Sequence, residues 1–344
     1  MIKRTSFILI GVLVLASLLA VGCSKSNEGA QQEQKKIEMR FGMQAADLVS
    51  HPSSLTNGFF VEELYKRLGR DRINITFYFN GQLGNTGEQI LGGVLNRTAE
   101  FMDFNFASYA DYTTAFTPIE TPYLFLDPQQ AYDLIDGEAF KIMQDQAIKD
   151  SGLRLLYLSN NGFRQFTNNR YPITSPDQMR GMKFRVMMNP VYISLVEVLG
   201  GLATPISFSE LYIALQQRVV DGQENPITTY IDLKYYETSQ TYMTLTNHVF
   251  GSSSCVMSDE YYQSLPADIR QAIDECALLA QKESRKFLEK FEDEQLAFLR
   301  ERITVTELTQ DQMKAFQDRA KTMWPEVMKL TSEEYFNKIV SYIK

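Results

Sequence analysis

The chain has 344 residues, of which 44% are apolar and 22% charged, and this composition argues against a disordered, collagen-like or polytopic membrane protein. Its formal net charge of −8 gives it no general attraction for nucleic acid or for anionic lipid. Three Cys and two His leave little material for a Cys/His zinc cage or for His-based catalysis. The length, about twice that of a usual domain, predicts one large or two medium domains.

Residues 1–22 have the pattern of a secretory signal peptide. Lys3 and Arg4 supply the positive start, and residues 7–20 form a short apolar stretch that ends just before Cys23. This pattern resembles a bacterial lipobox, which predicts that Cys23 becomes the lipidated N-terminus. A transmembrane anchor is the alternative, although the stretch is shorter than the roughly 20 residues of a membrane span. Both interpretations predict an exported protein that is tethered to the membrane.

Residues 23–37 are polar and low in complexity, which predicts a flexible tether between the lipid and the folded body. Acyl chains on Cys23 would hold the protein at the outer face of the inner membrane. Two further cysteines, Cys255 and Cys276, could form a disulfide in an exported protein. Two buried free thiols are the alternative, and the sequence leaves both open.

Strand and helix patterns alternate through the first half of the body. The predicted elements are, in chain order, a strand over 37–43, a helix over 55–68, a strand over 73–79, a helix from Glu88, a strand over 101–106, a helix over 129–149 and a buried strand over 153–158.

The second half continues in the same style. Ser175 is a predicted helix N-cap followed by Pro, and Ser207 with Glu210 matches a capping box. The remaining predicted elements are a strand over 183–186, helices over 190–199 and 211–218, a strand over 250–257 and a helix over 267–300.

This alternation predicts an α/β protein with a mostly parallel sheet. The total length suggests two α/β lobes. A helix over 267–300 would be about 50 Å long, which exceeds one small domain, so we expect it to run across both lobes.

Three polar residues stand where strands end or turn. Arg185, in a short predicted strand, is placed to enter the crevice beyond a sheet, where open α/β folds bind ligands. Its guanidinium fork matches a carboxylate. Arg164 follows a buried strand, in a segment that is either a ligand-side loop or a crossover between lobes. Asn225 can donate and accept hydrogen bonds, and Pro226 limits it to extended geometry. Considered singly, each is more often a surface or turn residue.

Enzyme signatures are not found in the sequence. It contains no dinucleotide-binding glycine motif, no Walker loop, no zinc-protease motif and no nucleophile elbow. His51 and His248 are the only histidines, and we expect each to make a local hydrogen bond rather than to bind metal. No cofactor or metal is predicted.

Several segments, in the same order, resemble the solute-binding proteins of TRAP transporters (tripartite ATP-independent periplasmic), the DctP-like family. The resemblance covers about residues 38–330. Its segments are Phe77-Tyr-Phe-Asn-Gly-Gln-Leu-Gly84, Thr121-Pro-Tyr-Leu-Phe125, Gly162-Phe-Arg-Gln-Phe-Thr-Asn168, Pro176-Asp-Gln-Met-Arg-Gly-Met-Lys-Phe-Arg-Val186 and the long run from Ile206 to Pro226, which includes Ser-Phe-Ser-Glu-Leu and Asp-Gly-Gln-Glu-Asn-Pro.

The resemblance implies a two-lobe, Venus-flytrap architecture around a cleft, with a long helix shared by both lobes. It places lobe I at 38–161 plus 251–290 and lobe II at 162–250 plus 291–344. The family binds organic acids, and its motifs map the main carboxylate partner onto Arg185 and a second cationic contact onto Arg164. They map a hydrogen-bonding amide onto Asn225 and a packing aromatic onto Phe208.

The lobe I side of the predicted site is carried by Gln44, Glu88 and Asn105, which lie after a strand, at a helix start and at a strand end. Polar groups opposite two Arg suggest a hydroxylated acid such as a sugar acid. The resemblance therefore implies capture of a small carboxylate in the periplasm and its delivery to the membrane subunits of a TRAP permease. A protein that presents its ligand to a signalling receptor and an exported enzyme acting on a similar acid are the alternatives.

Overall fold

The computed structural model describes residues 36–84 and 86–343. The predicted signal peptide, the lipidation site Cys23 and nearly all of the tether lie outside the described residues. None of the described helices combines the length and apolar character that crossing a membrane requires.

Ten strands of the described chain are linked into one path of pairings, which runs β2-β1-β3-β9-β4-β7-β5-β6 with β8 on β4 and β10 on β8. The strands are β1 (Ile37–Gly42), β2 (Ile73–Tyr78), β3 (Phe101–Asn105), β4 (Leu153–Asn168), β5 (Lys183–Val186), β6 (Leu202–Pro205), β7 (Gly222–Pro226), β8 (Tyr242–Leu245), β9 (Phe250–Ser258) and β10 (Thr304–Glu307).

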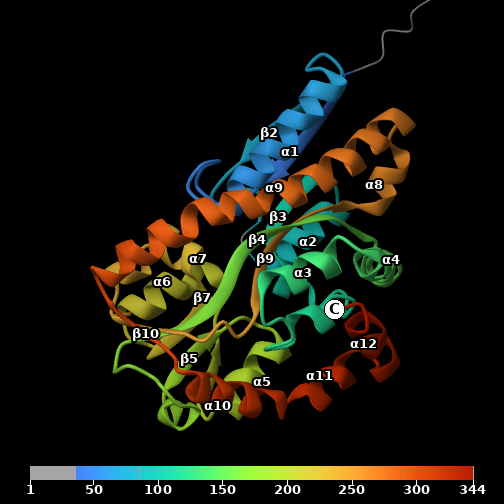
Figure 1. Ribbon diagram of the computed structural model, residues 1–344. Helices are drawn as coiled ribbons and strands as arrows, with labels where there is room; N and C mark the ends of the chain where they lie inside the picture. The colour runs from blue at the N-terminus through green and yellow to red at the C-terminus, as the bar shows by residue number, and fades with distance from the viewer. Residues whose placement is uncertain (1–35, 85, 344) are drawn as a thin grey trace, which may run out of the picture. The chain divides into compact units, whose positions relative to one another are not determined.

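Helices connect and cover these strands (Figure 1). The α-helices are α1 (Pro52–Leu68), α2 (Gly87–Leu95), α3 (Pro128–Ile135), α4 (Glu138–Ser151), α5 (Pro190–Val198), α6 (Phe208–Gln216), α7 (Ile227–Asp232), α8 (Asp259–Ser264), α9 (Ala267–Arg300), α10 (Gln310–Lys321), α11 (Trp324–Leu330) and α12 (Glu333–Val340). The 3-10 helices are η1 (Phe106–Tyr109), η2 (Thr117–Glu120), η3 (Pro176–Met179) and η4 (Tyr235–Glu237).

Strand β4 belongs to two groups of strands. Its first part, 153–163, pairs with β9, which pairs in turn with β3, and β3, β1 and β2 follow as parallel neighbours. Its last part, 164–168, pairs with β7 and β8, and these lead to β5, β6 and β10. We call these the first and the second strand group. Nearly every residue of β4 is buried, as expected of a strand covered on both faces.

The antiparallel pairings of the described strands all include β4 or β9, so the sheet is mixed rather than mostly parallel. The remaining pairings are parallel and come from strands joined by helices, as the alternation predicts. The α/β class is confirmed, and the departure lies in the two strands that connect the groups.

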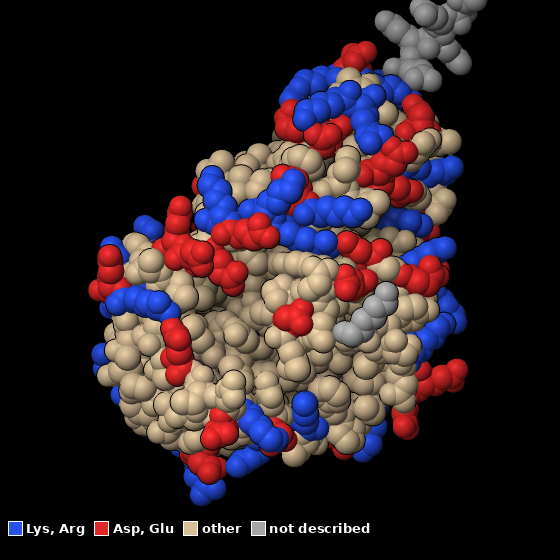
Figure 2. All heavy atoms as spheres, in the orientation of Figure 1, with Lys and Arg blue, Asp and Glu red and all other residues tan. Residues whose placement is uncertain are grey.

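Helix α9 spans both strand groups. Ile269 and Ile273 pack in one core with Phe41 and Phe101 of the first group, whereas Leu299 packs in another core with Met243 of the second. The opposite face of α9 is polar. Figure 2 shows charged side chains crowded over α1, α8 and α9, whereas the centre of the molecular surface in this view carries few. The predicted long shared helix has the observed bounds 267–300.

Three local predictions are corrected. The single helix predicted over 129–149 is two helices, because the chain breaks at Asp136 and Gly137, and Gly137 is the N-cap of α4. Helix α1 begins at Pro52, where the His51 side chain serves as an uncommon N-cap. Ser207 makes no capping bond at the start of α6, and its hydroxyl donates instead to the Glu210 carboxylate at 2.5 Å.

The predicted lobe boundaries stay a prediction. Near the boundary at 161–162, the register of β4 against β9 shifts between Asn160 and Gly162. Helix α12, in the range predicted for lobe II, packs against α4 and η2 from the range predicted for lobe I. Cys255 and Cys276, the two cysteines among the described residues, are buried free thiols.

Candidate functional site

A cavity of about 400 Å³ is lined by residues that come from both strand groups. This volume lies in the usual range of small-molecule sites, ~300–1,000 Å³. Six of the predicted site residues line it: Arg185, Asn225, Phe208, Gln44, Glu88 and Asn105. The exception is Arg164, which is not among the lining residues.

Arg185 is a buried cation on the cavity wall. It lies in β5 between Thr204 of β6 and Gln223 of β7, and only 1% of its side chain is exposed. Its Nε donates to the Ile206 carbonyl at 2.8 Å, while its Nη1 finds no hydrogen-bond partner among the described residues. Burial lowers the pKa of Arg185 to about 10, so the group is still charged at neutral pH. An unpartnered, buried guanidinium N–H on a cavity wall is suited to an anionic ligand.

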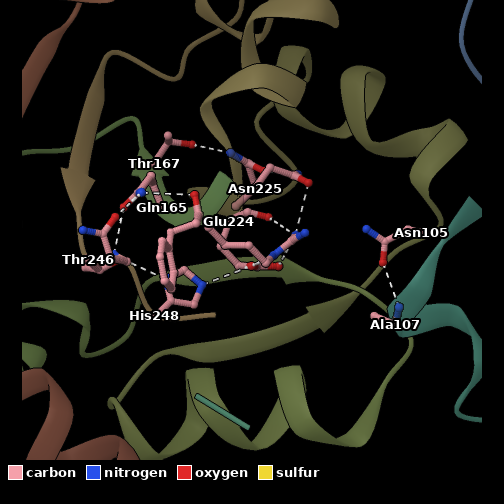
Figure 3. Close-up of polar contacts among 12 residues, drawn as sticks. Asn105, Ala107, Gln165, Thr167, Glu224, Asn225, Thr246 and His248 are labelled. Atoms are coloured by element: carbon pink, nitrogen blue, oxygen red, sulfur yellow. Dashed lines mark hydrogen bonds and ion pairs between the residues drawn. The ribbon is translucent and has the colours of Figure 1, made fainter. Parts of the chain in front are cut away.

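Arg164 is paired inside the protein. Its guanidinium forms a buried ion pair with Glu224 of β7, in which Nη2 lies 2.9 Å from Oε1. His248 Nε2 lies 3.1 Å from the same carboxylate (Figure 3). Burial alone would raise the pKa of Glu224, but Arg164 and His248 outweigh it and hold that pKa below its ordinary value. The Glu224 carboxylate therefore neutralises the charge of Arg164.

Asn225 connects this ion pair to the cavity. Its Oδ1 accepts from Arg164 Nη2 at 3.1 Å, and its Nδ2 donates to Gln223 Oε1 at 2.5 Å (Figure 3). It sits in β7, extended before Pro226 as predicted, and is 4% exposed. The segment with Arg164 was predicted as a loop or a crossover between lobes. It is not a loop, because it forms part of β4, the strand that pairs with both strand groups.

The other predicted residues line the cavity from the ends of elements. Phe208 is half-buried at the start of α6, and Glu88 is exposed in the first turn of α2. Gln44 follows β1. Asn105 ends β3, and its Oδ1 accepts from the Ala107 N–H at 3.0 Å (Figure 3).

Asp103 is a cavity residue that the sequence reasoning missed. It lies in β3, is 7% exposed and accepts from Asn57 Nδ2 at 2.8 Å through its Oδ2. Its Oδ1 has no hydrogen-bond partner among the described residues. Burial raises the pKa of Asp103 to about 7, although hydrogen bonds from Asn57 and Ser53 partly offset this effect. The sequence does offer one indication of this residue, because Asp103 is the only charged residue in the otherwise largely apolar strand Phe101–Asn105.

Both histidines make local hydrogen bonds, as predicted. His51 Nδ1 lies 2.8 Å from Ser53 Oγ, and burial lowers the pKa of this cavity-lining imidazole to about 4, so it is neutral at pH 7. His248 stacks on Phe166 with ring centroids 4.4 Å apart. Among the described residues, no group of three or more His, Cys, Asp or Glu is arranged to hold a metal ion.

Comparisons with known proteins show the family and the fold of the chain. Residues 49–330 match the family model of bacterial extracellular solute-binding protein, family 7 (DctP). A solute-binding protein of Chromohalobacter salexigens is 31% identical over 245 residues, which cover 70% of this chain and 71% of the relative. A TRAP periplasmic solute-binding protein of Shewanella oneidensis, solved with bound succinate, is 25% identical with a TM-score of 0.82 over 90% of this chain and 100% of that chain.

A sugar acid binding protein of Advenella mimigardefordensis, solved with galactonate, is 28% identical with a TM-score of 0.82, over 90% of this chain and 98% of that chain. The family match covers most of the chain, and each of the two structural likenesses covers 90% of it. The chain therefore belongs to bacterial extracellular solute-binding protein family 7, the DctP family of TRAP-type solute-binding proteins.

Proposed function

We propose that this protein captures a small organic acid in the cavity, through the carboxylate of the acid, and delivers it to the membrane subunits of a TRAP permease. The observation that carries the proposal is Arg185, a residue of the cavity lining that is 1% exposed and whose Nη1 has no hydrogen-bond partner in the described part of the chain. A buried charge costs free energy until a counter-charge pairs with it, so an anion that fills this position is held by a desolvated ion pair.

Asn225 and Phe208 complete the carboxylate end of the site in this proposal. The Asn225 amide can hydrogen-bond the acid, and Phe208 packs against its apolar surface. Arg164 acts indirectly, because its charge is paired with Glu224 and its Nη2 holds Asn225 Oδ1 at 3.1 Å. We therefore assign Arg164 as a positioning residue for Asn225 rather than as a second carboxylate ligand.

The comparisons support an acid as ligand. The Shewanella relative was solved with succinate and the Advenella relative with galactonate, and both ligands carry a carboxylate. We also propose that the ligand is bound and released without chemical change, since the neighbours are binding proteins. An NMR spectrum of the acid that is unaltered after prolonged incubation with the protein is the expected result, and a new product would contradict it.

The same proposal places the protein at the outer face of the cell membrane, held by lipid on Cys23 through the tether. It rests on the sequence pattern alone, because Cys23 lies outside the described residues. Cys23→Ser is expected to move the protein from the membrane fraction to the soluble extracytoplasmic fraction. Equal membrane association of both proteins would reject the anchor and leave the binding site untouched.

Arg185→Gln tests the binding site. The substitution removes the charge, so we expect the Kd for a bound acid to rise about 30-fold or more, which corresponds to ~2 kcal/mol or more. Isothermal titration with succinate and with galactonate measures it. Arg180→Gln is the matched control, since Arg180 is exposed and lies outside the cavity lining. If Arg185→Gln binds the acid with unchanged affinity while circular dichroism shows a folded protein, Arg185 is not the carboxylate-binding residue.

A further inference from the structure

The charges on the cavity wall are unevenly distributed. Among the described lining residues, Arg185 is the only Lys or Arg, and His51 is neutral at pH 7 because burial holds its pKa at about 4. Four carboxyl groups line the same cavity: Glu88, Asp103, Asp111 and Asp232. The cavity therefore offers one cationic group for one carboxylate, and its remaining charged groups are acidic.

Asp103 is the best-defined of these acids, because a chain of hydrogen bonds fixes its orientation. Tyr157 Oη donates to Asn57 Oδ1 at 2.7 Å, and Asn57 Nδ2 donates to Asp103 Oδ2 at 2.8 Å. Burial raises the pKa of Tyr157 well above its ordinary value, so this phenol keeps its proton and stays a donor. Turning the Asn57 amide round would place its Oδ1 against the Asp103 carboxylate, so an ionised Asp103 accepts from Asn57 Nδ2.

Asp103 is a residue of the cavity lining, and this arrangement leaves its Oδ1 buried and without a hydrogen-bond partner among the described residues. A buried carboxylate oxygen accepts hydrogen bonds and repels another carboxylate. Arg185, another lining residue, has the corresponding buried donor, its Nη1, which is unpartnered within the described residues. The two atoms come from different strand groups, since Arg185 lies in β5 and Asp103 in β3.

We propose that Asp103 reads the end of the ligand that lies away from its carboxylate, and that it selects monocarboxylates bearing hydroxyl groups while rejecting dicarboxylates. This inference rests on the proposed function, which supplies the carboxylate at Arg185. The neutral lining supports a hydroxylated chain, because 11 of its side chains carry an amide or a hydroxyl group, among them Gln44, Asn80, Asn105, Asn161, Ser53 and Ser253.

Matched pairs of sugar acids test the selection. Gluconate and glucarate have the same carbon chain and differ only in whether the far end is a CH₂OH group or a second carboxylate; galactonate with galactarate and mannonate with mannarate form further pairs. Titrations at pH 8 keep Asp103 ionised. We expect at least one monocarboxylate to bind, and to bind ten-fold or more tightly than its dicarboxylate partner.

Asp103→Asn gives a sharper test. With Asn57 donating as it does to Asp103, the new amide turns its oxygen toward Asn57 and its NH₂ group away from it, which converts an acceptor into a donor. The preference for the monocarboxylate should therefore fall ten-fold or more, and the dicarboxylate should gain affinity. Asp145→Asn is the control, since Asp145 is exposed on α4 and lies outside the cavity lining, and we expect its preference to change less than three-fold.

A second readout is the pH dependence of the preference. The titratable groups around Asp103 are His51, Tyr109, Tyr157 and Cys255; burial keeps the imidazole neutral and raises the pKa of the phenols and the thiol. None of these four groups changes charge between pH 6 and 8. The wild-type preference should therefore weaken from pH 8 to pH 6, as Asp103 becomes protonated, and that change should be absent in Asp103→Asn.

Each outcome has one meaning. If a monocarboxylate is preferred and Asp103→Asn, but not Asp145→Asn, removes the preference, the inference stands. If dicarboxylates bind equally well, or if succinate binds and none of the six sugar acids does, the inference is overturned while the proposed function survives. If no acid of either kind binds, the proposed function fails together with the inference. A melting curve for each variant shows whether the protein tested was folded.

Discussion

Glu120 is a buried carboxyl group near the Arg164 ion pair. It ends η2, is 3% exposed and accepts from Asn189 Nδ2 at 3.2 Å, while its Oε1 has no partner among the described residues. Burial raises the pKa of Glu120 to about 8, although Asn189 and the charge of Arg164 partly offset it. The folded protein thus keeps this proton at pH values where the unfolded chain has already lost it.

Glu120→Gln should change how the free energy of unfolding depends on pH. Between about pH 4.5 and pH 8 the folded state binds more protons at this site than the unfolded state, so its contribution to stability is present at low pH and is lost as pH rises. The neutral Gln removes that loss. We expect the free energy of unfolding of the variant, relative to that of wild type, to rise by a few kcal/mol as the pH is raised from 5 to 8. Urea unfolding at both pH values measures it; parallel pH curves would contradict it.

Individual residues were predictable to different degrees. Arg185 and Asn225 were assigned to the site through the family resemblance, since their positions near strand ends alone favour a surface or turn role, and both line the cavity. The pairing of Arg164 with Glu224 could not, since 60 residues separate them and only the β4–β7 register brings them together. Asp103 was missed because nothing in the local sequence around a single Asp in a strand indicates that its Oδ1 is buried.

At the scale of elements, the close approach of β5 and β7 depends on a glycine. A Cβ at Gly222 would lie 2.4 Å from the Thr167 carbonyl oxygen and 2.4 Å from Phe184 Cε1. Gly222 pairs with Phe184 across the two strands, immediately before the segment that carries Glu224 and Asn225. A side chain here would force apart the backbone that positions the carboxylate end of the site.

Gly222→Ala is therefore expected to destabilise the protein by about 1–3 kcal/mol or more, because the neighbouring backbone oxygen cannot move aside cheaply. Gly92→Ala is the matched control: it lies inside α2, nothing stands within 4 Å of its added Cβ, and we expect a gain of about 0.5–1 kcal/mol. Chemical denaturation of both variants gives the comparison. Equal effects of the two substitutions would show that the strand contact does not govern stability.

The elements themselves were largely predictable where their periodicity was strong, as for the helix over 267–300. Strand β4 was predicted over 153–158 and extends to Asn168, since its polar second half looks like a loop until β7 and β8 pair with it. Long-range pairing of this kind overrides local polarity, and a single sequence does not contain it.

At the scale of the whole molecule, we expect the two strand groups to close on the ligand. The cavity takes Asp103 from one group and Arg185 from the other, and β4 and β9 run between the groups with a register shift between Asn160 and Gly162. A bound acid that touches both sides favours the closed form by its additional contacts.

Small-angle scattering should therefore report a smaller radius of gyration when a bound acid is added to the mature protein. Arg185→Gln should show no change at the same ligand concentration, and Arg180→Gln should behave like wild type. A ligand that binds tightly in calorimetry and leaves the scattering curve unaltered would exclude closure as the response.

Arg185 and Asp103 lie on separate strand groups, and this separation has an evolutionary consequence. Descendants of this protein can change their ligand specificity by substitutions on one strand group only, while the contact with the common carboxylate is retained. In an alignment of orthologues, the cavity residues on the β3 side should vary with the acid that each protein binds, whereas those on the β5 side should be invariant.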